Sequence, residues 1–314
     1  MILSISGIFL FLLKQDSSII KLVILLLGAT NIEIKDIIRR YFWVILISMI
    51  AVVFLTQIGF LENLVYDRGD GTIRNSLGLL YPTNFSSRIF FLVLCYAYLK
   101  DFKLKAVELI VIGIISYLTL ILTDGRLDVY SIVFILALVL IKKLPVVKQK
   151  IIALASILVI PLSILFTIAS SVMYDPQNSI SIFLNRLLSN RLRLGKEAFE
   201  RYSPFTPFGQ IVESNGWGGL EGKALNPAEY FYIDSSYLKI LFMQGFITFI
   251  VVIALILYTQ VKFVKMKKYN IVFVFAIMGI YAIVSEFLIK PEYFPFILSL
   301  YSLVNEEDTI PSME

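Results

Sequence analysis

The sequence predicts an all-α membrane protein, a polytopic bundle of about ten transmembrane helices with one large extracytoplasmic loop. Three observations predict this fold class. Of the 314 residues 58% are hydrophobic and only 16% are charged, with a mean hydropathy of +0.84, whereas ordinary soluble domains are about half apolar and about a quarter charged. Apolar runs near the length of a membrane span recur along the chain, and lysines gather between them. We expect residues 1–314 to form a single integral membrane domain.

A spanning helix needs roughly 20 mostly apolar residues. Five runs approach or exceed this length: 41–61, 106–123, 151–173, 237–260 and 270–289. Shorter apolar runs are expected to complete the bundle: 1–13, 18–29, 85–99, 128–141 and 294–304.

The lysine-rich turns set the expected orientation. By the positive-inside rule, the side that collects lysine is cytoplasmic. These inner positions are Lys35 with Arg39 and Arg40, then Lys100, Lys103, Lys105, Lys142, Lys143, Lys148, Lys150, Lys262, Lys265, Lys267 and Lys268. Both termini are then expected on the cytoplasmic side of the cell membrane. The outer side receives 62–84, the turn at 124–127, the large loop at 174–236, and 290–293.

Composition excludes several kinds of chemistry. The chain has no histidine, so Ser-His-Asp and Cys-His catalysis, histidine-ligated metals and haem are ruled out. Its one cysteine, Cys95, lies in an apolar run and is expected to be a small buried hydrophobe. We expect no cofactor and no metal. The net charge of +5 does not indicate a nucleic-acid partner in a membrane chain.

Arginine is distributed in the opposite way to lysine. Eight of the ten arginines lie at or beyond the outer boundary: Arg68, Arg74, Arg88, Arg126, Arg186, Arg191, Arg193 and Arg201. The planar guanidinium binds phosphate in a bidentate manner and stays charged, so this cluster indicates an anionic head group, best a diphosphate, at the outer leaflet. Alternatively, the arginines contact lipid phosphates or pair with nearby acids, namely Asp67, Asp70, Asp124, Asp128, Glu197 and Glu200.

Three segments hold the candidate functional residues. Arg126 lies in a tight turn between two helices, where a functional role is compatible with pairing to Asp124 or Asp128. Residues 181–200 predict one amphipathic helix, in which Gly195 is a possible break. One polar face of this helix carries Arg186, Asn190, Arg193, Glu197 and Glu200. Arg191 lies off that face, and it either touches lipid phosphates with the others or points into a protein cavity.

The outer loop supplies further candidates. Residues 203–229 form a turn-rich segment in which Trp217 either stacks on a sugar ring or belongs to an interfacial aromatic belt. Asp234 precedes the next long helix, as an N-cap or as a carboxylate that binds a sugar hydroxyl or acts as a base. Glu286 is a carboxylate at membrane depth, and Lys290 is its expected i,i+4 partner.

Six motifs, in this order and on these sides, resemble a known family. They are 56–60 (TQIGF), the outer positions Arg74, Ser76, Leu77, Gly78, Pro82 and Asn84, then 124–126 (DGR), 187–192 (LLSNRL), 207–209 (PFG), and 234–247 (DSSYL and MQGFI). The chain is similar to Wzy-type polysaccharide polymerases of the O-antigen polymerase and ligase superfamily, most of all those of Gram-positive capsule or exopolysaccharide clusters. The resemblance covers about residues 30–290.

The resemblance implies a GT-C-like, metal-independent glycosyltransferase. Such proteins join undecaprenyl-diphosphate-linked oligosaccharide repeat units at the outer face of the membrane, beside membrane lipids and with chain-length regulator and flippase proteins as partners. By motif match, Arg126 and Arg191 bind diphosphate, with Arg74 next, and Asp234 is the base or acceptor anchor. Arg68, Arg186, Arg193 and Trp217 complete the expected substrate site.

Two departures keep alternatives open. Tyr81 stands where the family often has histidine before Pro-Asn, and the ligase branch relies on a histidine that this chain lacks. The missing histidine argues against ligase activity. The alternatives are a flippase or transporter of lipid-linked oligosaccharide and, against that argument, a ligase-like glycan transferase. A transporter is expected to carry charges along a midplane cavity, whereas the centres of these spans are nearly free of charge.

Overall fold

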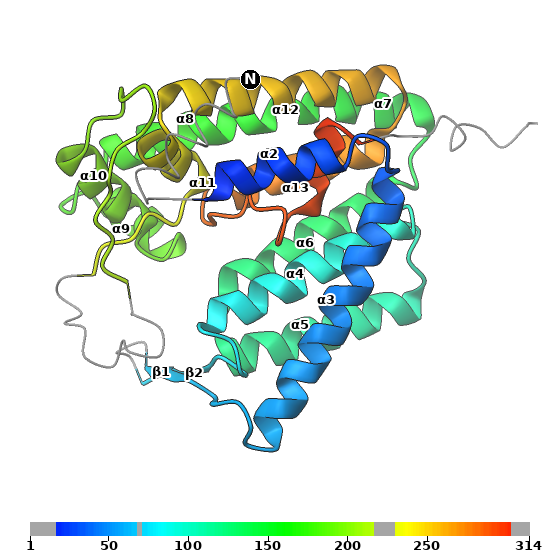
Figure 1. The fold of residues 1–314 in the computed structure, drawn as a ribbon, viewed down its shortest axis with the longest axis horizontal. Coiled ribbons are helices and arrows are strands. Elements are labelled where there is room, and N and C mark those ends of the chain that lie inside the picture. Colours follow the sequence, from blue (N-terminus) through cyan, green and yellow to red (C-terminus); the bar gives the residue numbers. More distant parts are fainter. Residues whose placement is uncertain (1–16, 68–70, 217–229, 303–314) are drawn as a thin grey trace, which may run out of the picture. The chain divides into compact units, whose positions relative to one another are not determined.

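A computed structural model describes residues 17–67, 71–216 and 230–302. The structure is mostly helical, with 67% helix and little sheet, which confirms the helical class (Figure 1). The elements, in chain order, are α2 (Ser18–Gly28), α3 (Ile34–Gln57), β1 (Val65–Asp67), β2 (Ile73–Asn75), α4 (Pro82–Leu99), α5 (Ala106–Thr123), α6 (Arg126–Ile141), α7 (Val146–Ser156), α8 (Val159–Val172), α9 (Ser179–Leu187), α10 (Arg191–Arg201), α11 (Ser236–Lys239), the π-helix η3 (Ile240–Gln244), α12 (Phe246–Lys265), α13 (Tyr269–Tyr281) and the 3-10 helix η4 (Pro295–Leu300).

Within the described ranges, four helices are long and apolar enough to cross a membrane: Ile34–Gln57, Ala106–Thr123, Val146–Val172 and Phe246–Lys265. All four overlap predicted spans. Large apolar side chains are exposed along α5, among them Ile110, Ile114, Leu118 and Ile121. Exposure of such side chains to water is unfavourable, so this surface is compatible with a lipid environment. The predicted span 1–13 lies outside the described residues.

The chain divides into two compact units, and each is described by itself. The described part of the first unit is 17–34, 150–216 and 230–302, and that of the second is 35–67 and 71–149. In the second unit α4 packs against both α5 and α6, as Figure 1 shows. The strands β1 and β2 pair antiparallel, with Tyr66 opposite Arg74. This hairpin was not predicted.

Asn63 and Ser76 close the base of the hairpin. The Asn63 amide donates to Asn75 Oδ1 at 2.9 Å, and its oxygen accepts from the Leu77 N–H at 2.9 Å. Ser76 is fully buried, and its hydroxyl accepts from the Leu64 N–H at 3.0 Å. These side chains satisfy buried backbone groups where two short strands leave them unpaired, so the two ends of the hairpin are held together.

In the first unit, α13 packs against α8 and α12, and α10 packs against α8. The predicted span 237–260 is not one helix. The chain forms the short α11, one π-helical turn and a break at Gly245 before α12 begins. Gly245 has φ +89°, a left-handed conformation that glycine adopts without steric cost. Sequence hydropathy alone does not register such a break.

The predicted amphipathic helix 181–200 is also divided, and not at Gly195. It ends at Leu187 and restarts at Arg191, because Ser189 and Asn190 are both left-handed, with φ of +52° and +69°. The Asn185 side chain spans the break, since its amide donates to Asn190 Oδ1 at 3.0 Å and its oxygen accepts from the Arg193 N–H at 3.0 Å. The single polar face predicted for this segment is therefore wrong.

Gly195 instead allows close helix packing. A Cβ atom added there would lie 2.3 Å from Ser171 Oγ of α8. In the same unit, α13 ends at Tyr281, whereas the predicted span continued to 289. The helix predicted at 294–304 is, in the part that the structure describes, the six-residue 3-10 helix η4. Pro295 begins η4, because its fixed φ suits a first helical position.

Candidate functional site

Arg191 and Asp234 form an ion pair in the first unit. Arg191 is the first residue of α10, and its Nη2 lies 3.2 Å from Asp234 Oδ2. Its Nε donates to the Val284 carbonyl at 3.3 Å and its Nη1 to the Ser189 carbonyl at 2.9 Å. The guanidinium is thus oriented by three chain segments, which brings together two of the residues predicted to be catalytic.

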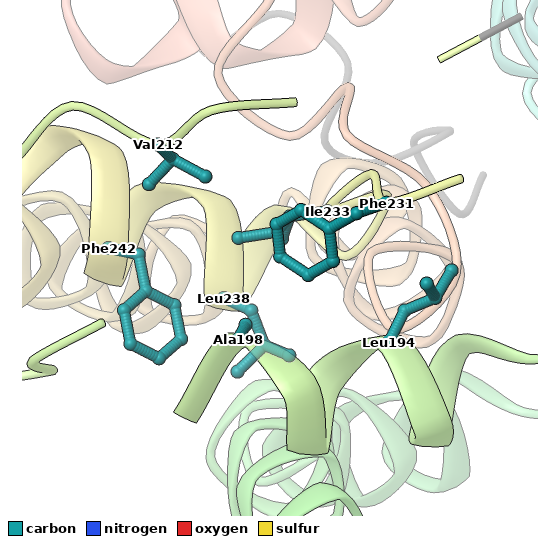
Figure 2. Close-up of a cluster of buried hydrophobic side chains, with 7 residues drawn as sticks. All are labelled: Leu194, Ala198, Val212, Phe231, Ile233, Leu238 and Phe242. Carbon is teal, nitrogen blue, oxygen red and sulfur yellow. The ribbon is translucent and has the colours of Figure 1, made fainter. Parts of the chain in front are cut away.

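A hydrophobic cluster fixes the geometry of this pair (Figure 2). Its members are Leu194, Ala198, Val212, Phe231, Ile233, Leu238 and Phe242. Leu194 lies one helical turn after Arg191, and Ile233 directly precedes Asp234. Phe231 also forms a β-bridge with Asn215, with N–H···O distances of 2.8 and 3.0 Å. Apolar burial on either side therefore holds the two charged groups against each other.

The Ser-Ser-Tyr sequence after Asp234 attaches this segment to the end of α13. The Ser236 N–H donates to the Ser285 carbonyl at 2.8 Å, and the Tyr237 hydroxyl donates to the Gly279 carbonyl at 2.7 Å. Ser235 is the N-cap residue of α11. The N-cap interpretation of Asp234 is therefore wrong, because its carboxylate is engaged by Arg191.

A second charged group adjoins the first. Glu286 Oε1 lies 2.7 Å from Lys290 Nζ, which confirms the predicted i,i+4 pair. Its Oε2 pairs with Lys239 and accepts from the Tyr232 hydroxyl at 2.9 Å. Lys239 was missed by the sequence analysis. The available signal was a lysine inside a predicted span, since an ionisable residue there indicates a functional site by default.

Burial shifts the titration of the loop carboxylate, Asp234. It raises the pKa of Asp234 above its ordinary value, and the attraction of Arg191 does not offset this effect. A carboxylate with a shifted pKa beside a specific charged partner is typical of functional sites.

The second unit contains the other predicted catalytic arginine. Arg126 Nε lies 2.7 Å from Asp124 Oδ1, with the arginine side chain 47% exposed and the aspartate 11% exposed. This confirms the predicted tight turn and the Asp124 pairing. Arg74 reaches the same turn, because its Nε donates to the Thr123 carbonyl at 2.9 Å. Two of the predicted diphosphate-binding arginines therefore flank the end of α5.

Asp128 connects this turn to α4. Its buried carboxylate accepts from the Ser86 and Ser87 hydroxyls at the start of α4. Gly125 packs on the same serine, since a Cβ there would lie 2.3 Å from Ser86 Oγ. The Arg126 turn is therefore fixed to α4 by close contact.

Among the other predicted substrate-binding residues, the structure describes Arg186 and Arg193. Arg186 is exposed on α9. Arg193 pairs with Glu197 at 3.3 Å, and Glu197 also pairs with Arg201. Arg68 and Trp217 lie outside the described residues. Glu197 thus confirms one of the structural pairings that the sequence left open.

The sequence motifs meet in pairs within each unit. PFG at 207–209 lies against MQGFI at 243–247: a Cβ on Gly209 would be 2.1 Å from the Met243 carbonyl oxygen, and the Phe246 N–H donates to the Thr206 carbonyl at 2.9 Å. In the second unit, a Cβ on Gly78 would lie 2.1 Å from Thr56 Oγ1 of TQIGF. At both Gly209 and Gly78 the neighbouring atoms leave no room for a Cβ atom, so close packing explains each glycine.

Within the described ranges, no three histidine, cysteine, aspartate or glutamate side chains gather as metal ligands would. The chain matches no protein-family model, no curated protein and no solved structure.

Proposed function

We propose that this protein is a polysaccharide polymerase that joins undecaprenyl-diphosphate-linked oligosaccharide units at the outer face of the cell membrane. The observation that carries the proposal is the ion pair of Arg191 with Asp234, which combines a phosphate-binding group with a carboxylate of raised pKa. Both residues belong to motifs that carry the sequence resemblance. The contacts between PFG and MQGFI further support reading these motifs as parts of one arrangement.

The chemistry of glycan transfer suits these groups. The leaving lipid diphosphate develops negative charge, which an oriented guanidinium in a partly buried site stabilises. The attacking sugar hydroxyl loses a proton, and in the proposal Asp234 accepts it. General-base catalysis of this kind typically contributes about 10²–10⁴-fold. In the second unit, Arg126 and Arg74 are proposed to bind a diphosphate at the end of α5.

The proposal includes the finer topology. About ten spans surround the site, residues 174–236 form the large extracytoplasmic loop, and both termini are cytoplasmic. The lysine distribution supports this orientation, and the four long apolar helices supply the most secure spans.

Reconstitution with an isotope-labelled lipid-linked repeat unit tests the function. Elongated, lipid-linked glycan in proteoliposomes is the expected product, and it is lost in Asp234→Asn. Asp175→Asn is the matched control, because Asp175 lies exposed in the same predicted loop and its carboxylate accepts from the nearby Gln177 N–H at 2.9 Å. Translocation without elongation would identify a flippase instead.

A further inference from the structure

Five charged side chains, the proposed base Asp234 among them, gather in the first unit. Three are cations, Arg191, Lys239 and Lys290, and two are carboxylates, Asp234 and Glu286. Their side chains are between 14 and 23% exposed. This group, which we call the charge cluster, is therefore largely withdrawn from water and still open to a ligand.

The two carboxylates of the charge cluster pair with different numbers of cations. Asp234 is engaged by Arg191, so Glu286 alone serves two ammonium groups, with Oε2 on Lys239 and Oε1 on Lys290. A partly buried charge costs free energy unless an opposite charge pairs with it. Among these five described side chains, the positive charges exceed the negative by one, which favours an anion as ligand.

Lys239 is the cation best suited to exchange its partner. Its Nζ also donates to the Tyr232 hydroxyl at 3.2 Å, so both of its partners lie outside its own helix. It directly precedes the π-helical turn η3, and π-helical turns occur frequently at functional sites. A lysine ammonium is a mobile point charge and a common phosphate binder.

We propose that Lys239 is a further substrate-binding residue, whose ammonium joins Arg191 in binding the diphosphate of the lipid-linked substrate, and that Glu286 holds this ammonium in the substrate-free protein. The identity of the isoprenoid carrier rests on the proposed function. Binding of a diphosphate group rests only on the charge cluster. In this proposal Glu286 competes with the diphosphate for the Lys239 ammonium. If the ion pair were purely structural, Glu286 would not compete with a ligand.

Calorimetric titration of the purified full-length protein tests the proposal. The probes are undecaprenyl diphosphate and inorganic diphosphate in detergent. Lys239→Gln is expected to weaken binding of both by about tenfold, the effect of one lost charged hydrogen bond. Glu286→Gln is expected to tighten binding, because it removes the competing carboxylate. Lys196→Gln is the matched control, as Lys196 pairs with Glu200 at i,i+4 in the same unit and should bind like the wild type.

Specific results would overturn the proposal. Unchanged affinity in Lys239→Gln, or weaker affinity in Glu286→Gln with a normal melting temperature, would do so. If Lys239→Gln does not fold, the double variant Lys239→Gln/Glu286→Gln, in which only Lys290 loses its carboxylate partner, must bind diphosphate more weakly than Glu286→Gln. Binding of anionic phospholipid vesicles alone, with neither diphosphate bound, also contradicts it.

The same titration separates this proposal from the proposed function. If Lys239-dependent diphosphate binding occurs but no glycan is elongated, the polymerase function fails and the binding role of Lys239 stands. If elongation occurs and Lys239→Gln binds both diphosphates as tightly as the wild type, only the role of Lys239 fails.

Discussion

Arg191 begins helix α10 directly against Asp234, with 3.2 Å between Nη2 and Oδ2. The break at Ser189 and Asn190 creates this relationship, because it lets a new helix start at the arginine. A continuous helix over 181–200 would have directed Arg191 differently. The pair is the basis for the first two predictions.

Replacing Asp234 by Asn keeps its size and removes its charge. If Asp234 is the base, polymer elongation should fall by about 10²–10⁴-fold, measured as chain length of labelled glycan in proteoliposomes. Asp175→Asn should elongate normally. An unchanged chain length in Asp234→Asn would end the assignment of the base.

The raised pKa of Asp234 makes stability depend on pH. A carboxyl whose folded pKa exceeds the unfolded value, about 3.9, stabilises the fold below that value, and this contribution is lost as pH rises through the folded pKa. The charged groups facing it are Arg191, Glu286 and Lys239. Asp234→Asn lacks this titration, so its melting temperature relative to wild type should rise between about pH 4 and the folded pKa. Parallel melting curves would contradict the shift.

Gly245→Ala should destabilise the first unit. Position 245 has φ +89°, and an added Cβ would lie 2.3 Å from the Gly209 nitrogen. The left-handed conformation alone costs about 1–2 kcal/mol in a residue with a Cβ, and the clash adds to it. Gly113→Ala is the control, and it should change stability in the opposite direction. Gly113 lies within α5, and nothing lies within 4 Å of an added Cβ, so alanine should stabilise the helix by about 0.5–1 kcal/mol. Thermal unfolding in detergent measures both, and equal effects would refute the packing argument.

Asp128→Ala should destabilise the second unit through the lost hydrogen bonds of Ser86 and Ser87. A hydrogen bond to a charged group contributes about 1.5–3 kcal/mol, and the Ser86 hydroxyl keeps the Thr83 carbonyl as a second acceptor at 3.2 Å. Asp101→Ala removes a more exposed aspartate, 3.8 Å from Lys35, and such surface pairs contribute about 0–1 kcal/mol. Denaturant unfolding should therefore separate the two variants clearly. Similar losses would show that Asp128 does not fix the Arg126 turn.

Cysteine accessibility tests the predicted sidedness. Cys95 is fully buried, so it should remain unlabelled and need not be replaced. A membrane-impermeant maleimide added to whole cells should label Asp175→Cys and leave Lys148→Cys unmodified until the cells are opened. The reverse pattern would invert the topology and remove the outer location of the arginines.

Several features of the site follow from local sequence rules. Glu286 and Lys290 pair as their four-residue spacing predicted, although both lie beyond the end of α13, and Asp124 pairs with Arg126 because both lie in one tight turn. The four long apolar helices follow from hydropathy alone. Each of these features depends on neighbours in the chain, so the sequence contains the information needed to predict it.

Other features depend on contacts between distant segments. The sequence predicted single helices over 181–200 and 237–260. The first is divided by left-handed residues at 189–190, and the Asn185 side chain bonds across that break. The second is divided at Gly245, which packs closely against Gly209.

The amino-acid sequence by itself determined that the chain is apolar and helical, and it singled out Arg126, Arg191 and Asp234 as candidate site residues. It could do so because composition and short-range spacing act locally. Only the tertiary structure decided that Arg191 pairs with Asp234, that Lys239 pairs with Glu286, and that Asp128 accepts hydrogen bonds from Ser86 and Ser87. These partners are distant in the chain, and packing of buried side chains alone brings them together.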